Sequence, residues 1–176
     1  MAGVNTTVHD VRELWREFVP SYRGFSYAPF IVKLHRWDPA LAATVRGFSA
    51  RRSESRIANY LDPAEIERVR RKLDAKPDAS IRFGVSKDGA GYHGERGDFC
   101  LVAGCITRRA HLTLFHRRLE LIGGLAYDLV LIEELGRRLD IRWRSVTLMA
   151  REARAFARRG NSNEKLYSKL QPLLKE

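Results

Sequence analysis

The sequence predicts a single α+β domain, in which helices pack on a mixed β-sheet. Three observations predict this class. The chain has 176 residues, enough to bury one hydrophobic core. Its hydrophobic share of 44% and charged share of 30% are typical of globular proteins. Segments with the apolar spacing of helices alternate with short runs of β-branched and aromatic residues, which are typical of strands.

Helix signals dominate the first 75 residues. Apolar residues fall on one helical stripe over residues 8–18, which predicts a first helix that ends before Pro20. Asp38 and Asp62 are each followed directly by a proline, which favours the first turn of a helix. We therefore expect one helix to begin at Asp38-Pro39 and a second to run from Asp62-Pro63 to Leu73.

Strand signals occur both within and after the first 75 residues, and further helices follow. Residues 30–34 and 79–85 read as short strands, and residues 99–106 and 111–115 as a hairpin around 107–110. The remaining elements expected are an apolar helix over Asp128–Leu139, a strand over Val146–Met149, a helix over Ala150–Arg159 and a last amphipathic helix over residues 161–176.

Several protein classes are excluded by composition. No stretch approaches 18 uncharged apolar residues, so the sequence predicts no membrane span. The N-terminal ten residues lack the apolar core of a signal peptide. Cys100 and Cys105 alone cannot form a disulfide scaffold or a four-ligand zinc site. We expect a cytoplasmic protein with no metal ion.

The charge balance favours partners that carry phosphate. The chain has 32 basic and 21 acidic residues, for a formal net charge of +11. Residues 99–176 hold 15 basic and 8 acidic residues, whereas residues 1–98 hold 17 and 13. Such an excess attracts polyanions through Coulomb forces and counterion release. A solvated surface rich in arginine is the alternative.

Residues 100–128 contain the most informative set of residues in the chain. In order it holds Cys100, a hairpin, Arg117-Arg118-Leu119-Glu120, and the turn Gly124-Leu-Ala-Tyr-Asp128 before an apolar helix. This order resembles the core of the thymidylate synthase family, which has a catalytic cysteine, an Arg-Ser-x-Asp motif and a Gly-x-Pro-Phe-Asn turn. The resemblance covers about residues 98–140. It implies a thymidylate-synthase-like mixed sheet within residues 98–160, with residues 1–97 as a divergent N-terminal half of the same 1–176 domain.

The resemblance implies a role for each matching residue. Cys100 would be the nucleophile that adds to C6 of the pyrimidine, which makes C5 reactive toward a one-carbon donor. Arg117 would bind the 5′-phosphate, with Arg118 beside it in place of the family's serine. Glu120 would lie near a folate donor. Arg154 falls where the family has a histidine that binds the sugar.

The residue that ends the turn favours cytosine as the base of the expected substrate. The family has asparagine there in enzymes that use uracil and aspartate in those that act on cytosine, and here it is Asp128. A carboxylate accepts a hydrogen bond from the N4 amino group of cytosine and repels O4 of uracil. The resemblance thus implies a pyrimidine nucleotide C5 methyl- or hydroxymethyltransferase. It also implies a homodimer, since the family dimerises through a sheet face.

A second hypothesis is a catalytically inactive basic relative that binds nucleic acid. If Ala150–Arg159 is a helix, Arg151, Arg154 and Arg158 fall on one face and could contact successive phosphates of DNA or RNA. A third hypothesis is an assembly component that uses its amphipathic C-terminal helix.

Each candidate residue also has a plain structural explanation. Cys100 is in an apolar run and could be small core filler. Asp128 could cap the N-terminus of the helix that follows it. Arg117 and Arg118 could be solvated at a strand end. His111 and His116 show no spacing typical of metal ligands, and we expect both on the strand surface.

Overall fold

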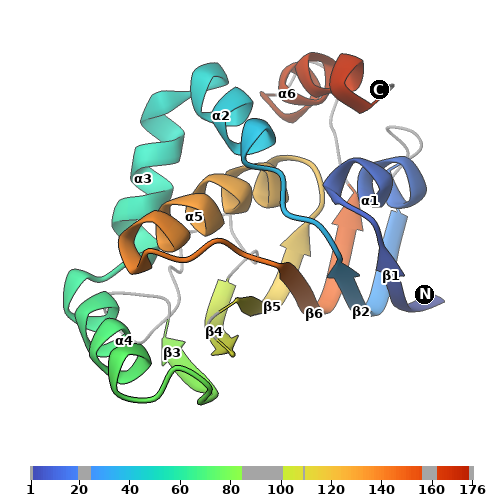
Figure 1. Cartoon of the computed structure of the whole chain (residues 1–176). Helices are drawn as coiled ribbons and strands as arrows, with labels where there is room; N and C mark the ends of the chain where they lie inside the picture. The colour runs from blue at the N-terminus through green and yellow to red at the C-terminus, as the bar shows by residue number, and fades with distance from the viewer. Residues whose placement is uncertain (1, 20–24, 85–100, 109, 156–161, 175–176) are drawn as a thin grey trace.

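The computed structural model describes residues 2–19, 25–84, 101–108, 110–155 and 162–174. Over these ranges the chain forms one six-stranded mixed sheet with helices packed on it, as Figure 1 shows. The predicted α+β class is confirmed. The strands are β1 (Ala2–Val8), β2 (Phe25–Leu34), β3 (Ile81–Gly84), β4 (Leu101–Thr107), β5 (His111–Glu120) and β6 (Ser145–Ala155).

Six α-helices connect or follow these strands in the described ranges. They are α1 (Val11–Phe18), α2 (Pro39–Phe48), α3 (Ala50–Tyr60), α4 (Pro63–Ala75), α5 (Gly123–Leu139) and α6 (Ser162–Leu170). A 3₁₀ turn, η1 (Gln171–Leu174), follows α6.

The strand order places both parallel crossovers on one face of the sheet. The order is β1-β2-β6-β5-β4-β3, with β1 parallel to β2, β5 parallel to β6, and the β2–β6 pair antiparallel. Along this order the chain moves from β1 to β2 in one direction and from β5 to β6 in the other. The β1–β2 pair also runs antiparallel to the β5–β6 pair. Right-handed crossovers of this kind put α1 and α5 on the same face. Burial agrees, because alternate residues are buried over 30–34 of β2, 112–116 of β5 and 146–150 of β6.

Helix α5 lies at the centre of the core. It is apolar around most of its circumference: Leu129, Val130 and Leu131 are all buried, although successive residues of a helix point about 100° apart. A helix of this kind must be covered on all sides. The sheet covers α5 on one side and α2, α3, α4 and α6 contact it on others. The predicted apolar helix behind a sheet that contains β4, β5 and β6 is confirmed.

The N-terminal half contains two elements that the sequence did not predict. Residues 2–8 form strand β1, so Val8 belongs to the sheet and the first helix begins only at Val11, capped by Asp10. Residues 50–60 form α3. Helices α2 and α4 are confirmed, and the side chains of Asp38 and Asp62 accept the predicted capping hydrogen bonds from Ala40 and Ala64.

The helix predicted over Ala150–Arg159 is wrong. Residues 145–155 form one continuous strand, β6, which pairs with β2 on one side and β5 on the other. Alanine, arginine and glutamate favour helix locally, but two flanking strands satisfy the backbone of β6 and override that preference. Residues 156–159 lie outside the described residues.

The C-terminal helix packs into the core. Leu166 and Leu170 of α6 are buried, and the Tyr167 hydroxyl donates to the carbonyl of Val19 at 2.8 Å. Leu166, Tyr167 and Leu170 of α6 are therefore covered within the chain, and the hypothesis that the C-terminal helix serves as an assembly surface stays a prediction. Among the described residues, no helix combines the length and the apolar character needed to cross a membrane.

The sheet face opposite α1 and α5 is only partly buried. Register partners across it form an apolar row of Ile31, Met149, Phe115 and Ala103. Phe115 is 37% exposed, and the nearby Val102 is 45% exposed. The row beside it is polar and basic: Lys33, Thr147, Thr113, Cys105 and Arg82. We call this surface the open sheet face.

Candidate functional site

A fully buried carboxylate lies on α5 between β5 and α3. Asp128 is 0% exposed. Its Oδ1 accepts hydrogen bonds from Nε and Nη2 of Arg56 at 2.9 and 2.5 Å, and its Oδ2 lies 3.0 Å from Nε2 of His116. Arg56 also lies over the ring of Tyr60, with its guanidinium carbon 4.3 Å from the ring centroid. We call Arg56, Asp128 and His116 the Asp128 cluster.

The Asp128 cluster keeps its carboxylate ionised. Burial by itself raises the pKa of Asp128, but the charge of Arg56 and the hydrogen bond from His116 outweigh burial and hold the pKa below its usual value. Removal of either partner would leave a charge in a dry interior, which is expensive. Because α5 begins at Gly123, Asp128 is not at its N-terminus, and the capping explanation for this residue is wrong.

His116 is buried, not at the strand surface as predicted. Its side chain is on the same face of β5 as Leu112 and Leu114, which are both buried. Nδ1 of His116 is buried and has no hydrogen-bond partner within the part of the chain that the structure describes. His111, also on β5, is half-buried, and its Nδ1 lies 2.8 Å from Oγ of Ser145.

Glu120 caps α5 instead of facing a ligand. Its Oε1 accepts from the backbone N–H of Ile122 at 2.9 Å, and its Oε2 accepts from Gly123 and Gly124 at 2.5 and 2.7 Å. A side-chain β-carbon at Gly124 would lie 3.1 Å from Cβ of Glu120, so glycine permits this close approach. Both carboxylate oxygens therefore satisfy the free N–H groups of the first helical turn.

Arg118 and Arg154 meet at a second carboxylate, Glu152 on β6. Nε of Arg154 lies 2.5 Å from Oε1 of Glu152, and Nε of Arg118 lies 3.3 Å from Oε2. The hydroxyl of Ser26 on β2 donates to Oε1 at 2.9 Å. The hydrogen bond from Arg154 is the main cause of the lowered pKa of Glu152. Two of the arginines predicted to bind substrate are thus engaged with an acid that the sequence analysis did not select.

Arg117 and Arg151 lie on the open sheet face. Both are exposed, and each alternates with a buried residue of its strand, His116 on β5 and Ala150 on β6. Successive side chains of a strand point to opposite faces. The fold therefore directs Arg117 away from the face where Asp128 meets His116.

The predicted row of three helical arginines does not exist. Arg151 and Arg154 are three residues apart on strand β6, so their side chains do not share one face of a helix. Arg158, the third member, lies outside the described residues, and so does Cys100.

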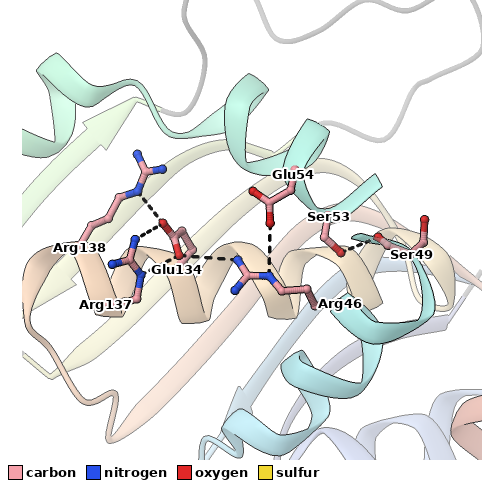
Figure 2. A network of polar contacts seen from close by, with 7 residues as sticks. All are labelled: Arg46, Ser49, Ser53, Glu54, Glu134, Arg137 and Arg138. Atoms are coloured by element: carbon pink, nitrogen blue, oxygen red, sulfur yellow. Dashed lines mark hydrogen bonds and ion pairs between the residues drawn. The ribbon is translucent and has the colours of Figure 1, made fainter. Parts of the chain in front are cut away.

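A different acidic and basic network occupies the other end of α5. Figure 2 shows Glu134 with Arg137 and Arg138 of the same helix and Arg46 of α2 around it. Arg137 donates two hydrogen bonds to the Glu134 carboxylate, at 2.9 and 2.6 Å, and Nε of Arg138 donates a third at 2.9 Å. Arg46 lies 3.6 Å from Glu134 and 3.5 Å from Glu54 of α3.

Hydrogen bonds from Arg137 and Arg138 lower the pKa of Glu134 from 4.5 to about 2. We call these residues the Glu134 network. It ties α2, α3 and α5 together at the protein surface.

Two hollows occur elsewhere on the described surface. One, of about 690 Å³, lies between α4 and β3 beside Lys72, Lys76 and Arg82. The other, of about 460 Å³, lies between α2 and α5 beside Arg46 and Glu133. Neither hollow is lined by a residue that the sequence analysis selected as a site residue.

Arg56 and His116 are the functional candidates that the sequence analysis missed. A signal for His116 was present, because it continues the alternation of Leu112 and Leu114 on the buried face of a strand. No local signal marks Arg56, which precedes its partner Asp128 by 72 positions.

Comparison with known proteins leaves the function open. No protein-family model matches this chain, and neither does any curated protein. The functional argument therefore depends on the geometry of the Asp128 cluster and on the motif that resembles thymidylate synthase.

Proposed function

We propose that this chain binds a cytosine nucleotide, with Asp128 as the residue that recognises the base, on a thymidylate-synthase-like fold. The single observation that supports this most is the ionised, fully buried Asp128 beside a histidine nitrogen that lacks a partner. Buried charged and polar groups of this kind cluster at functional sites. The order of β4, β5, α5 and β6 agrees with the resemblance that suggested the pyrimidine.

Arg56 explains how a sealed carboxylate could still bind a ligand. Its guanidinium donates two N–H groups to Oδ1 of Asp128, and its side chain is 18% exposed, the most exposed of the cluster. The N4 amino group of cytosine is likewise a planar N–H donor and can replace the guanidinium at Oδ1. In this proposal, binding of the base moves Arg56 toward solvent, where its charge can face the nucleotide phosphate.

The covalent part of the proposed function depends on Cys100. Its thiolate would form a bond to C6 of cytosine, and the electron pair of the C5=C6 bond would move to C5. Leu101, the next residue in the sequence, is the register partner of His116, so β4 enters the sheet beside the Asp128 cluster.

The residues expected near a folate donor do not fit that role. Both oxygens of Glu120 already accept backbone N–H groups of the first turn of α5. The proposed function therefore includes no transfer of a one-carbon group from a folate. It consists of nucleotide binding and addition of the thiolate, and both fit the cytoplasmic location expected from the sequence.

Calorimetry with two nucleotides tests base recognition. The wild-type protein should bind dCMP more tightly than dUMP, and Asp128→Asn should shift the preference toward dUMP, because an amide both donates and accepts. Melting temperatures of both proteins, measured in the same buffers, separate lost binding from lost folding. Equal affinity for the two nucleotides in both proteins would refute the proposed recognition.

Isotope exchange tests the covalent step without any donor. Addition of Cys100 to C6 makes the C5 hydrogen of dCMP exchange with solvent, so its NMR signal should disappear in D₂O. Cys100→Ser should abolish the exchange and leave dCMP affinity within about twofold, while Cys105→Ser serves as the matched control. Binding without exchange in the wild-type protein would limit the function to nucleotide binding.

A homodimer is part of the proposal. The apolar row of Ile31, Met149 and Phe115 on the open sheet face is a surface that a second copy could cover. Sedimentation should show a dimer for the wild-type protein and a monomer for Phe115→Glu. A wild-type monomer at micromolar concentration would contradict this part.

The alternative function, nucleic-acid binding by an inactive relative, uses the open sheet face as well. Its support is that exposed Arg117 and Arg151 lie beside the exposed ring of Phe115, an arrangement suited to stacked bases and phosphates. Binding of a single-stranded oligonucleotide that weakens steeply with salt and is lost in Arg117→Gln/Arg151→Gln would favour this alternative. A dimer that binds no oligonucleotide at low salt would exclude it.

A further inference from the structure

We infer that Nδ1 of His116 accepts a hydrogen bond from the bound nucleotide, and that Asp128 orients the imidazole for this role. The inference rests on the proposed function and adds a second ligand contact, on a residue that the motif resemblance did not select.

The position of the ring is fixed by one contact. Nε2 of His116 lies 3.0 Å from Oδ2 of Asp128, and the side chain of His116 is 1% exposed. The two ring nitrogens point in divergent directions, so Nδ1 faces away from the carboxylate. Nδ1 is buried and has no hydrogen-bond partner in the described part of the chain.

The protonation of the ring follows from its partner. An ionised carboxylate only accepts hydrogen bonds, so Nε2 must carry the proton that it donates to Oδ2. With the proton on Nε2, Nδ1 has a lone pair that can accept a hydrogen bond.

A lone pair in this position is unusual because buried polar atoms nearly always have partners. His111 on the same strand shows the usual arrangement, since its Nδ1 meets the hydroxyl of Ser145. An N–H or O–H group of a bound nucleotide would supply the missing donor at His116. The nucleotide would then be held at two points, by Oδ1 of Asp128 and by Nδ1 of His116.

Substitution by glutamine separates this role from a structural one. His116→Gln retains an N–H donor that can reach Oδ2 of Asp128 but lacks the acceptor at Nδ1. We expect its melting temperature to stay close to wild type while its affinity for dCMP falls at least tenfold in calorimetry. His111→Gln, on the same strand, is the matched control and should bind dCMP as the wild-type protein does.

NMR of protein with ¹⁵N-labelled histidine shows directly which ring nitrogen of His116 carries a proton. The chain has five histidines, and the signals absent from His116→Gln assign the ring of interest. We expect a proton on Nε2 and none on Nδ1 in the free protein, and a shift of the Nδ1 signal when dCMP saturates the site. In Asp128→Asn the amide oxygen is needed by Arg56, so the amide N–H faces His116 and the proton should move to Nδ1.

The outcomes distinguish the two proposals. If dCMP binds but the Nδ1 signal does not move and His116→Gln binds as tightly as wild type, the role of His116 is refuted and the proposed function stands. A proton on Nδ1 in the free wild-type protein also refutes it. If no nucleotide binds the wild-type protein, the proposed function fails and this inference fails with it.

Discussion

The two halves of helix α5 each hold a carboxylate surrounded by arginine, but in very different environments. Asp128 in the N-terminal half is fully buried, with one arginine and one histidine as partners. Glu134 in the C-terminal half is only 6% exposed, but Arg137, Arg138 and Arg46, which reach it from two helices, have side chains that are 29–69% exposed (Figure 2).

The difference lies in how far each network reaches solvent and in the kind of atom that lacks a partner. In the Glu134 network the carboxylate accepts three short hydrogen bonds, and the side chain of Arg137 is 69% exposed. Each network has one buried nitrogen without a hydrogen-bond partner among the described residues: Nε of Arg46, which can only donate, and Nδ1 of His116, which can accept. A network open to solvent stabilises helix packing modestly, whereas a fully buried charged cluster is expensive to keep and is the better candidate for a ligand site.

The largest expected effect is from Asp128→Ala. The substitution leaves Arg56 and His116 without their acceptor in the interior, so the free energy of unfolding should fall by about 3–5 kcal/mol. Urea unfolding followed by circular dichroism measures it. The double variant Asp128→Ala/Arg56→Met should recover part of the loss, because the unpaired charge is removed. If the free energy of unfolding of Asp128→Ala falls by less than about 1 kcal/mol, Asp128 stabilises the protein no more than Glu134 is expected to, and the two halves of α5 do not differ in this respect.

Loss of the helix cap should have the next largest effect. Glu120→Ala leaves the N–H groups of Ile122, Gly123 and Gly124 without their acceptor, and we expect a loss of about 2 kcal/mol. The same unfolding measurement applies, with Glu67→Ala on the exposed surface of α4 as the control that should change little. If the two variants lose equal stability, the cap contributes nothing measurable.

Glu134→Gln should cost less, about 1 kcal/mol near neutral pH, because its partners Arg137 and Arg46 are exposed and solvent can take the place of the carboxylate. The pKa of Glu134 is lowered in the folded protein from 4.5 to about 2. Its contribution is therefore complete above about pH 4.5, declines as the pH falls and is gone below about pH 2. Unfolding free energies of the two proteins, measured from pH 6 down to pH 3, should converge. A constant difference over that range would show that ionisation of Glu134 is not the cause.

The smallest effect is expected for Arg46→Gln. Arg46 lies 3.6 Å from Glu134 and 3.5 Å from Glu54, longer than a strong ion pair, so we expect a loss below about 0.5 kcal/mol. That loss should disappear in 1 M salt, because the screening length is then about 3 Å. A loss that persists in salt would indicate that the aliphatic part of Arg46 packs against α5.

Short-range pattern was enough to predict much of the fold. The Asp-Pro pairs at 38–39 and 62–63 predicted the starts of α2 and α4, because a capping side chain and a proline act within one turn. The long apolar run after Gly124 predicted that α5 would be buried. The spacing of residues 99–115 predicted the β4–β5 hairpin, whose partners are close along the chain.

Only the tertiary structure decided what depends on distant partners. Residues 150–155 favour helix locally but form a strand between β2 and β5, because two neighbouring strands supply hydrogen bonds that no local window contains. Asp128 was selected from the sequence, but its environment was not, since Arg56 is 72 residues away and reaches it only through the packing of α3 on α5. The sequence by itself thus selected Asp128 as a candidate, and the packing decided that Asp128 and His116 share a buried cluster while Arg117 lies on the opposite face of the sheet.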